Sequence, residues 1–131
     1  MRIAVTTDDR EHVDAPFGLA RHICIYEVAR EGARFLETHR FPERAPGCDG
    51  DALARRVAAL KNCTLLYTLE IGSRGSARAL ANGVRTVRVV RPRPISEVLS
   101  ALRADLEAVP PWLRSLLRAR KRPGGGSWEG R

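Results

Sequence analysis

The sequence has few cysteines and no long apolar run, and both shortages restrict the class of protein. Its three cysteines form no Cys-x-x-Cys pair, which excludes a dense disulfide framework and favours reduced thiols. No stretch approaches the roughly 18 consecutive apolar residues of a membrane-spanning helix. Residues 3–5 lead directly into Asp8 and Asp9, so the apolar core of a signal peptide is also missing. We therefore expect a cytoplasmic protein without a membrane partner.

Lysine is scarce as well, with 2 lysines against 21 arginines, and the formal net charge is +8. Residues 114–131 carry six basic residues and one acidic residue, so +5 of this charge is concentrated at the C-terminal end. A nucleic-acid-binding surface would spread its charge over one face of the fold. We therefore do not expect nucleic acid as a partner.

The length and the apolar pattern predict one α/β domain. A chain of 131 residues with 44% hydrophobic residues suits a single globular core. Strand-like apolar runs occur at residues 2–6, 22–28, 33–38, 64–69 and 86–90. Helical spacing occurs at 53–60 after an N-cap at Asp49, at about 75–81, at 95–106 and at 112–117. We expect a hairpin over 22–38 with an unusual backbone angle at Gly32, followed by parallel strands, and hence a mixed sheet with flanking helices.

Two connections in such a sheet are candidates for binding, because ligands gather beyond the carboxyl ends of parallel strands. They are the loop over residues 7–18 and the turn from Gly72 to Ser76. Backbone N–H groups and Arg74 would lie at a helix N-terminus in this turn, which suits an anion. The turn lacks the pattern of a P-loop or of a dinucleotide-binding loop, so a plain strand-to-helix connection is the alternative.

Several short phrases follow one another along residues 1–118. They are Arg-Ile-Ala-Val-Thr-Thr-Asp-Asp at 2–9, Phe-Gly-Leu-Ala-Arg at 17–21, Ile-Gly at 71–72, Ala-Asn-Gly-Val at 81–84, Pro-Ile-Ser-Glu-Val-Leu at 94–99 and Pro-Pro-Trp-Leu at 110–113. In this order they resemble the NifX/NafY group of nitrogenase cofactor-biosynthesis proteins, which share a domain with the C-terminal part of NifB. The resemblance implies a ribonuclease-H-like fold over residues 1–118. Residues 119–131 are basic and Gly-rich, which predicts a disordered tail.

The resemblance also implies a non-catalytic carrier or chaperone in nitrogenase cofactor assembly. Its cargo would be an iron–sulfur precursor or the finished cofactor, and its partners would be cofactor-assembly proteins or an apo-nitrogenase component. The loop and the turn would supply the cofactor contacts, namely Asp14, Phe17, Gly18, Gly72, Ser73, Arg74 and Ser76.

One position departs from the family. The family loop usually reads Val-Asp-Gln-His-Phe-Gly, and its histidine is the best candidate for a cluster ligand. Residues 13–18 here read Val-Asp-Ala-Pro-Phe-Gly, so Pro16, which has no ligating atom, replaces that histidine. Either other residues hold the cluster, or this member is a cluster-free protein-interaction module.

Iron–sulfur clusters are held by thiolates and occasionally by imidazoles, so the candidate ligands that remain are Cys48, His12, Cys63 and His22. Cys48 lies in a polar loop before a predicted helix, where a thiolate is favoured, and an incidental exposed thiol is the alternative. His12 lies two positions from Asp14 in the candidate loop and could replace the family histidine, and a solvated loop histidine without a ligand role is the alternative. Cys63 opens a predicted buried strand, where packing in the core is the alternative role, as it is for Cys24.

Asp8, Asp9 and Asp14 raise a third possibility, a metal-dependent nuclease, because paired carboxylates can hold two Mg²⁺ ions. Such a site needs carboxylates from separate elements at one end of the sheet. The next acids, Glu27 and Glu37, lie on the predicted hairpin instead. Turn formation explains Asp8 and Asp9 without catalysis. We therefore expect no enzymatic activity.

Overall fold

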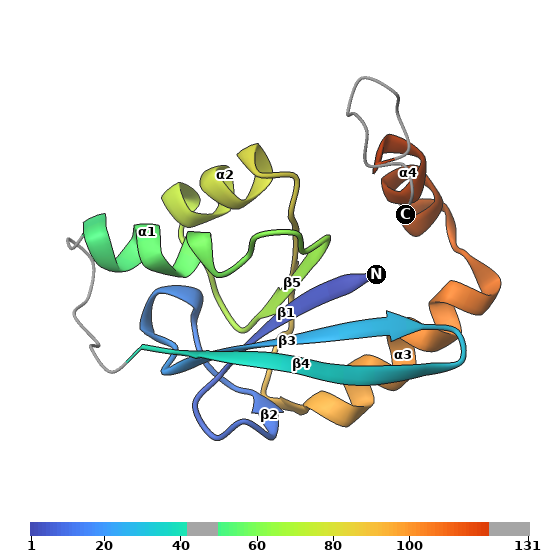
Figure 1. Ribbon diagram of the computed structural model, residues 1–131, viewed down its shortest axis with the longest axis horizontal. Coiled ribbons are helices and arrows are strands. Elements are labelled where there is room, and N and C mark those ends of the chain that lie inside the picture. The colour runs from blue at the N-terminus through green and yellow to red at the C-terminus, as the bar shows by residue number, and fades with distance from the viewer. Residues whose placement is uncertain (42–49, 121–131) are drawn as a thin grey trace.

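The computed structural model describes residues 1–41 and 50–120, and its centre is a mixed five-stranded sheet (Figure 1). The strands are β1 (Arg2–Thr7), β3 (His22–Ala29), β4 (Gly32–Arg40), β5 (Leu65–Thr68) and β6 (Arg85–Arg88). Their order across the sheet is β4-β3-β1-β5-β6. The strands β4, β3 and β1 pair antiparallel, whereas β1, β5 and β6 pair parallel. The predicted α/β class, with an N-terminal hairpin and a mixed sheet, is confirmed.

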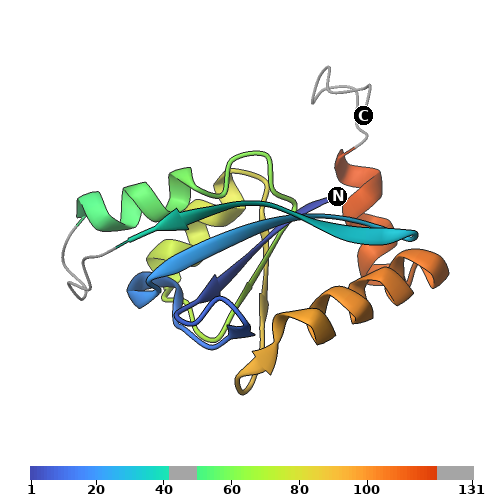
Figure 2. The ribbon, with the colours of Figure 1, turned by 60° about the horizontal axis from the view of Figure 1, so that its bottom comes forward.

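Helices cover both faces of this sheet (Figures 1 and 2). The helices α1 (Gly50–Ala58) and α2 (Ser73–Ala81) lie on one face, and α3 (Ile95–Ala108) and α4 (Pro111–Arg120) lie on the other. Leu65 and Leu66 are both fully buried, because successive side chains of β5 enter opposite cores. A central strand covered on both sides therefore has a continuous apolar sequence. None of the described helices is long and apolar enough to cross a membrane.

Three short elements at the end of β1 were not predicted. They are β2 (His12–Val13), η1 (Phe17–Leu19) and β7 (Arg93–Pro94). The strands β2 and β7 pair antiparallel as a separate two-stranded sheet. The amide of Ile95 also donates to the Glu11 carbonyl at 2.8 Å. These contacts join the loop after β1 to the beginning of α3.

The prediction of an unusual backbone angle at Gly32 is wrong. Gly32 is the first residue of β4 and pairs with Ala29, so the two-residue turn between them closes without a left-handed glycine. Among the described glycines only Gly83, after α2, has a positive φ, of 78°. The other described residues with a positive φ are Arg10 (64°), Asn62 (68°) and Val109 (43°).

An arginine on α1, Arg56, belongs to the core. Arg56 is 1% exposed and is the largest fully buried side chain among the described residues. Its Nη2 donates to the Ala20 carbonyl at 3.0 Å, and its guanidinium carbon lies 4.6 Å from the ring centroid of Phe41. Arg56 therefore ties α1 to the end of the candidate loop and to the end of β4.

Candidate functional site

The loop after β1 is fixed to the carboxyl end of β5 by buried polar contacts. The Thr6 hydroxyl lies 2.7 Å from the Ala15 carbonyl oxygen and 2.9 Å from the Thr68 hydroxyl. The amide of Phe17 donates to the Glu70 carbonyl at 2.7 Å. Because Thr6 and Thr68 are both fully buried, the loop is held in one position relative to the sheet.

The predicted loop and the predicted turn lie next to each other. Phe17 is 1% exposed and packs in the core on the α1/α2 side of the sheet. A Cβ atom at Gly75 would lie 3.3 Å from Phe17 Cδ2 and 3.2 Å from Ile71 Cγ1, so glycine lets the first turn of α2 approach the loop. Phe17 thus anchors the loop to the core on the α1/α2 side of the sheet.

The turn before α2 presents a helix N-terminus to solvent. Gly72 is the N-cap residue, no side chain caps the helix, and its first turn contains no acid. Ser73 and Arg74 are exposed, as is Gly18 in the loop, and Ser76 is half-buried. The first amides of a helix have no partner within the helix, so this end favours an anion.

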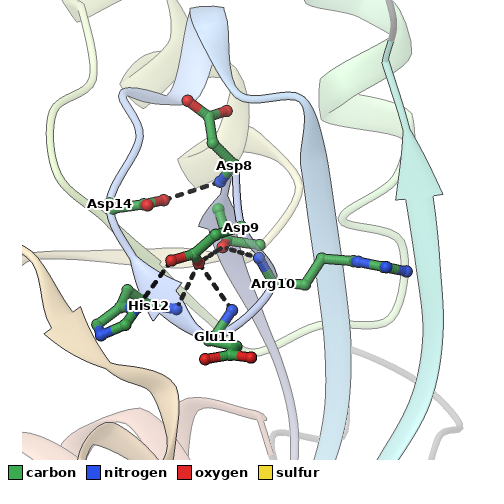
Figure 3. Close-up of polar contacts among 7 residues, drawn as sticks. Asp8, Asp9, Arg10, Glu11, His12 and Asp14 are labelled. Carbon is green, nitrogen blue, oxygen red and sulfur yellow. Dashed lines mark hydrogen bonds and ion pairs between the residues drawn. The ribbon is translucent and has the colours of Figure 1, made fainter.

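Three aspartates build the loop itself. Asp14 Oδ1 accepts from the Asp8 amide at 2.8 Å, and Asp8 Oδ1 accepts from the Arg21 amide at 2.9 Å. Asp9 Oδ1 accepts from the amides of Glu11 and His12, both at 2.8 Å (Figure 3). These carboxylates therefore act as backbone caps, as turn formation predicted.

The carboxylate of Asp9 also holds the His12 ring. Its Oδ2 lies 2.8 Å from His12 Nδ1 (Figure 3). Desolvation opposes the ionisation of Asp9, but the hydrogen bonds from Glu11, His12 and Thr7 outweigh it and lower the pKa of Asp9 to about 2. The hydrogen bond to Asp9 in turn raises the pKa of His12 above its ordinary value.

The second ring nitrogen of His12 is directed away from Asp9. The side chain is 42% exposed, and within residues 1–41 and 50–120 no hydrogen bond involves Nε2. A carboxylate on one ring nitrogen is the arrangement that fixes the tautomer and orientation of histidine metal ligands. His12 is therefore oriented as a donor with an accessible Nε2.

A hollow of about 400 Å³ lies beside this ring. Its lining comes from the loop, from β3 and from the beginning of α3: Arg10, Glu11, His12, Tyr26, Pro94, Ile95, Ser96 and Leu99. Helix α3 has Pro94 as its N-cap residue and no side-chain cap. The Arg10 side chain favours an anion in the hollow, whereas Glu11, which lines it, and Glu97, in the first turn of α3, oppose one.

The other candidate ligands are dispersed. Cys48 lies outside the described residues, as does Asp49. Cys63 is 1% exposed and adjoins Thr64, whose amide bonds to the Arg2 carbonyl at the beginning of β1. The candidate loop begins at the other end of β1, roughly 17 Å away at the rise of an extended strand. The structure therefore separates Cys63 from the loop.

His22 lies at the loop end of the sheet, opposite Thr7 in the pairing of β1 with β3. It is half-buried, and its Nδ1 atom is shielded without a hydrogen-bond partner in the described structure. Over the residues described, no group of three or more His, Cys, Asp or Glu side chains is arranged to hold a metal ion. A bound cluster would therefore depend on few ligands from this part of the chain.

The contact of Asp9 with the His12 ring was not predicted from the sequence, because turn formation alone accounted for Asp9. The three-residue spacing between Asp9 and His12 was the available signal, since a side chain that caps the backbone of its third neighbour also lies near that neighbour's side chain.

Comparison with known proteins gives a consistent family. The model of the family described as "Dinitrogenase iron-molybdenum cofactor" matches residues 1–105. Protein NifX of Herbaspirillum seropedicae is 35% identical over 120 residues, which are 90% of this chain and 82% of that protein. Protein NifY of Azotobacter vinelandii is 37% identical over 123 residues, which are 91% of this chain and 49% of that protein.

A solved structure described as "Crystal structure of PH0822" matches with a TM-score of 0.62 and 24% identity, over 79% of this chain and 89% of that chain. At this identity the likeness concerns the fold alone. The family match covers most of the chain and agrees with the resemblance noted in its sequence. The chain belongs to the dinitrogenase iron-molybdenum cofactor family.

Proposed function

We propose that this protein is a non-catalytic carrier in nitrogenase cofactor assembly. Its cargo is an iron–sulfur precursor or the finished cofactor, bound at the loop after β1. The family match and the NifX and NifY relatives support a part in handling this cofactor. The observation that carries the proposal is the 2.8 Å contact between His12 Nδ1 and Asp9 Oδ2, which leaves Nε2 available as a ligand.

The replacement of the family histidine by Pro16 moves the ligand to the other side of the loop. Pro16 pairs with Glu70 next to α2, whereas His12 pairs with Pro94 next to α3. A cargo bound by His12 would therefore lie in the hollow lined by Arg10, whose positive charge favours the net negative charge of the cargo. The alternative anion site is the turn from Gly72 to Ser76, in which Arg74 supplies the positive charge.

Anaerobic loading of the purified protein with a cofactor precursor tests this proposal. After desalting, bound iron and visible absorption are measured for the wild type, His12→Ala and His39→Ala. His39 is a matched control, because it is also an exposed histidine bonded to a carboxylate, at 2.9 Å from Glu37. We expect stoichiometric iron in the wild type and the control, and its loss in His12→Ala.

Other outcomes reassign the ligand or reject the carrier. Iron retained in His12→Ala would contradict the role of His12 and direct the search to Cys48, His22 and Cys63. Iron absent from the wild type would contradict the carrier itself. Loss in Arg10→Ala but not in Arg74→Ala would support the hollow beside α3 as the binding place.

The second candidate is a cluster-free interaction module that acts on a nitrogenase component or on a cofactor-assembly protein. Two observations favour it: Pro16 has no ligating atom, and residues 1–41 and 50–120 contain no ready group of metal ligands. Binding of apo-nitrogenase by a protein that takes up no iron would favour this module over the carrier.

A further inference from the structure

The strand β6 leaves one edge of the main sheet open. It pairs with β5 alone, and among the described residues no strand lies on its outer side. The amides of Arg85 and Val89 donate inward, to the carbonyls of Thr64 and Thr68 at 3.0 and 2.9 Å. Because backbone groups alternate along a strand, Thr86 and Arg88 direct their N–H and C=O groups outward. This edge therefore offers a template for another strand.

A hollow adjoins this edge between the sheet and the helices α3 and α4. Its volume is about 470 Å³, and all four residues of β6 line it. Its apolar lining includes Val98, Leu102 and Trp112, together with Tyr67. The hollow is large enough for an apolar side chain from a bound segment.

The surroundings of this hollow are strongly positive. Residues 82–93, which include β6 and lead into β7, contain four arginines and no Asp or Glu. Arg85, Arg88 and Arg93 line the hollow, and the Arg85 guanidinium carbon lies 5.6 Å from the ring centroid of Trp112. Asp105 is the only acidic residue among those that line it. The charge therefore favours an acidic occupant.

Three occupants can be compared on these features. A second copy of β6 would bring four arginines together on two four-residue strands, which is unfavourable. A small anion would use the arginines but not the open backbone edge. An extended acidic segment would use the arginines, the outward backbone groups and the hollow.

We propose that the edge of β6 binds an extended acidic segment of a partner protein as an additional strand, with an apolar side chain of that segment in the hollow beside Trp112. The two hollows have no lining residue in common, so this inference does not depend on the cargo site. It can be tested with protein that carries no cluster.

The probe is a fluorescently labelled ten-residue peptide in which glutamate alternates with valine and phenylalanine. Fluorescence anisotropy with the full chain measures its affinity. We expect binding that weakens with salt, and at least about tenfold weaker binding by Arg88→Glu. The control is Arg34→Glu, on the exposed strand β4 at the opposite edge of the sheet. Its affinity for the peptide should fall by less than about threefold.

Thr86→Pro tests strand addition separately from charge. Proline removes the outward amide at position 86 and leaves the inward bonds of Arg85 and Val89 in place. We expect this variant to retain a cooperative thermal transition and to bind the peptide at least about tenfold more weakly. A peptide N-methylated at alternate backbone positions should also bind weakly to the wild type.

Equal binding of the N-methylated peptide, with competition by inorganic phosphate, would replace this proposal with a small-anion site. Equal loss in Arg34→Glu and Arg88→Glu would show unspecific attraction and overturn it. No binding of the acidic peptide to the wild type would overturn it as well.

Discussion

At the scale of single residues, the Asp9 carboxylate has two roles: it caps two backbone amides and it orients the His12 ring. Its pKa of about 2 lies below the unfolded value of about 3.9, so Asp9 stabilises the fold above about pH 4. This contribution is lost as the pH falls through about 2. The raised pKa of His12 has the opposite sign: its contribution is present below its ordinary value and is lost as the pH rises through the raised value.

Asp9→Asn should therefore reduce stability most at a pH between these two titrations. We expect the largest difference in urea midpoint from the wild type near pH 5, and smaller differences near pH 2 and pH 8. The difference should be modest, because both side chains are nearly half exposed. Glu107→Gln, at an exposed position of α3, controls for the loss of one negative charge. A difference that is constant across pH would contradict the Asp9–His12 coupling.

We predict a larger effect on the free energy of unfolding for a substitution of Arg56. Arg56→Met keeps an apolar stem but removes the guanidinium that donates to Ala20 and lies over Phe41. We expect a loss of about 2–4 kcal/mol in the free energy of unfolding, because a buried carbonyl loses its charged donor. Arg78→Met, at an exposed position of α2, should change stability by less than about 0.5 kcal/mol. Denaturant unfolding measures both, and equal small losses would refute a stabilising role for Arg56.

At the scale of elements, the end of α3 is strained. Val109 follows the helix with φ 43° and ψ 77°, a left-handed conformation that a β-branched residue adopts at a cost. Val109→Gly should raise the free energy of unfolding by about 0.5–1 kcal/mol, since Val109 is only half-buried and the relief exceeds the lost contact. Asn62→Gly is the control, because asparagine already tolerates its φ of 68°, and little change is expected. Destabilisation by Val109→Gly would show that its side-chain packing dominates.

The elements that could be predicted from the sequence are those with enough residues to repeat a pattern. β5 is short, but its continuous apolar run matches a strand buried on both faces, and α3 is long enough for several turns of helical spacing. The two-residue strands β2 and β7 contain no period, and only their pairing in space defines them. Gly32 misled the hairpin prediction because a two-residue turn does not require a left-handed glycine.

The same distinction applies to the candidate site. The position of Phe17 beside the turn before α2 follows from parallel strands that end at one edge, which sequence order predicts. The separation of Cys63 from the loop follows equally from strand direction, but only once β1 and β5 are known to pair in parallel. The contact of His12 with Asp9 depends on the exact path of the loop, including the left-handed Arg10, and periodicity does not encode that path.

At the scale of the whole molecule, one sheet separates two cores, and both cores depend on the same central strands. Ile3 and Val5 of β1 pack towards α3, whereas Ala4 packs towards α1 and α2. Leu65 and Leu66 divide β5 in the same way. Loss of either core would leave β1 and β5 with one uncovered apolar face. The two cores should therefore unfold together, despite their separation by the sheet.

Two probes, one for the α3 and α4 side of the sheet and one for the whole fold, can test this cooperativity. In a Trp128→Phe background, the fluorescence of Trp112 reports on the side of α3 and α4, and far-ultraviolet circular dichroism reports on the whole fold. We expect coincident urea transitions. Leu65→Ala and Leu66→Ala, which open cavities in different cores, should each lower both midpoints together, at a cost of about 2–5 kcal/mol. If Leu66→Ala shifted the circular dichroism transition but left that of Trp112 unchanged, the cores would be independent folding units, because the Trp112 side would then persist without the other face.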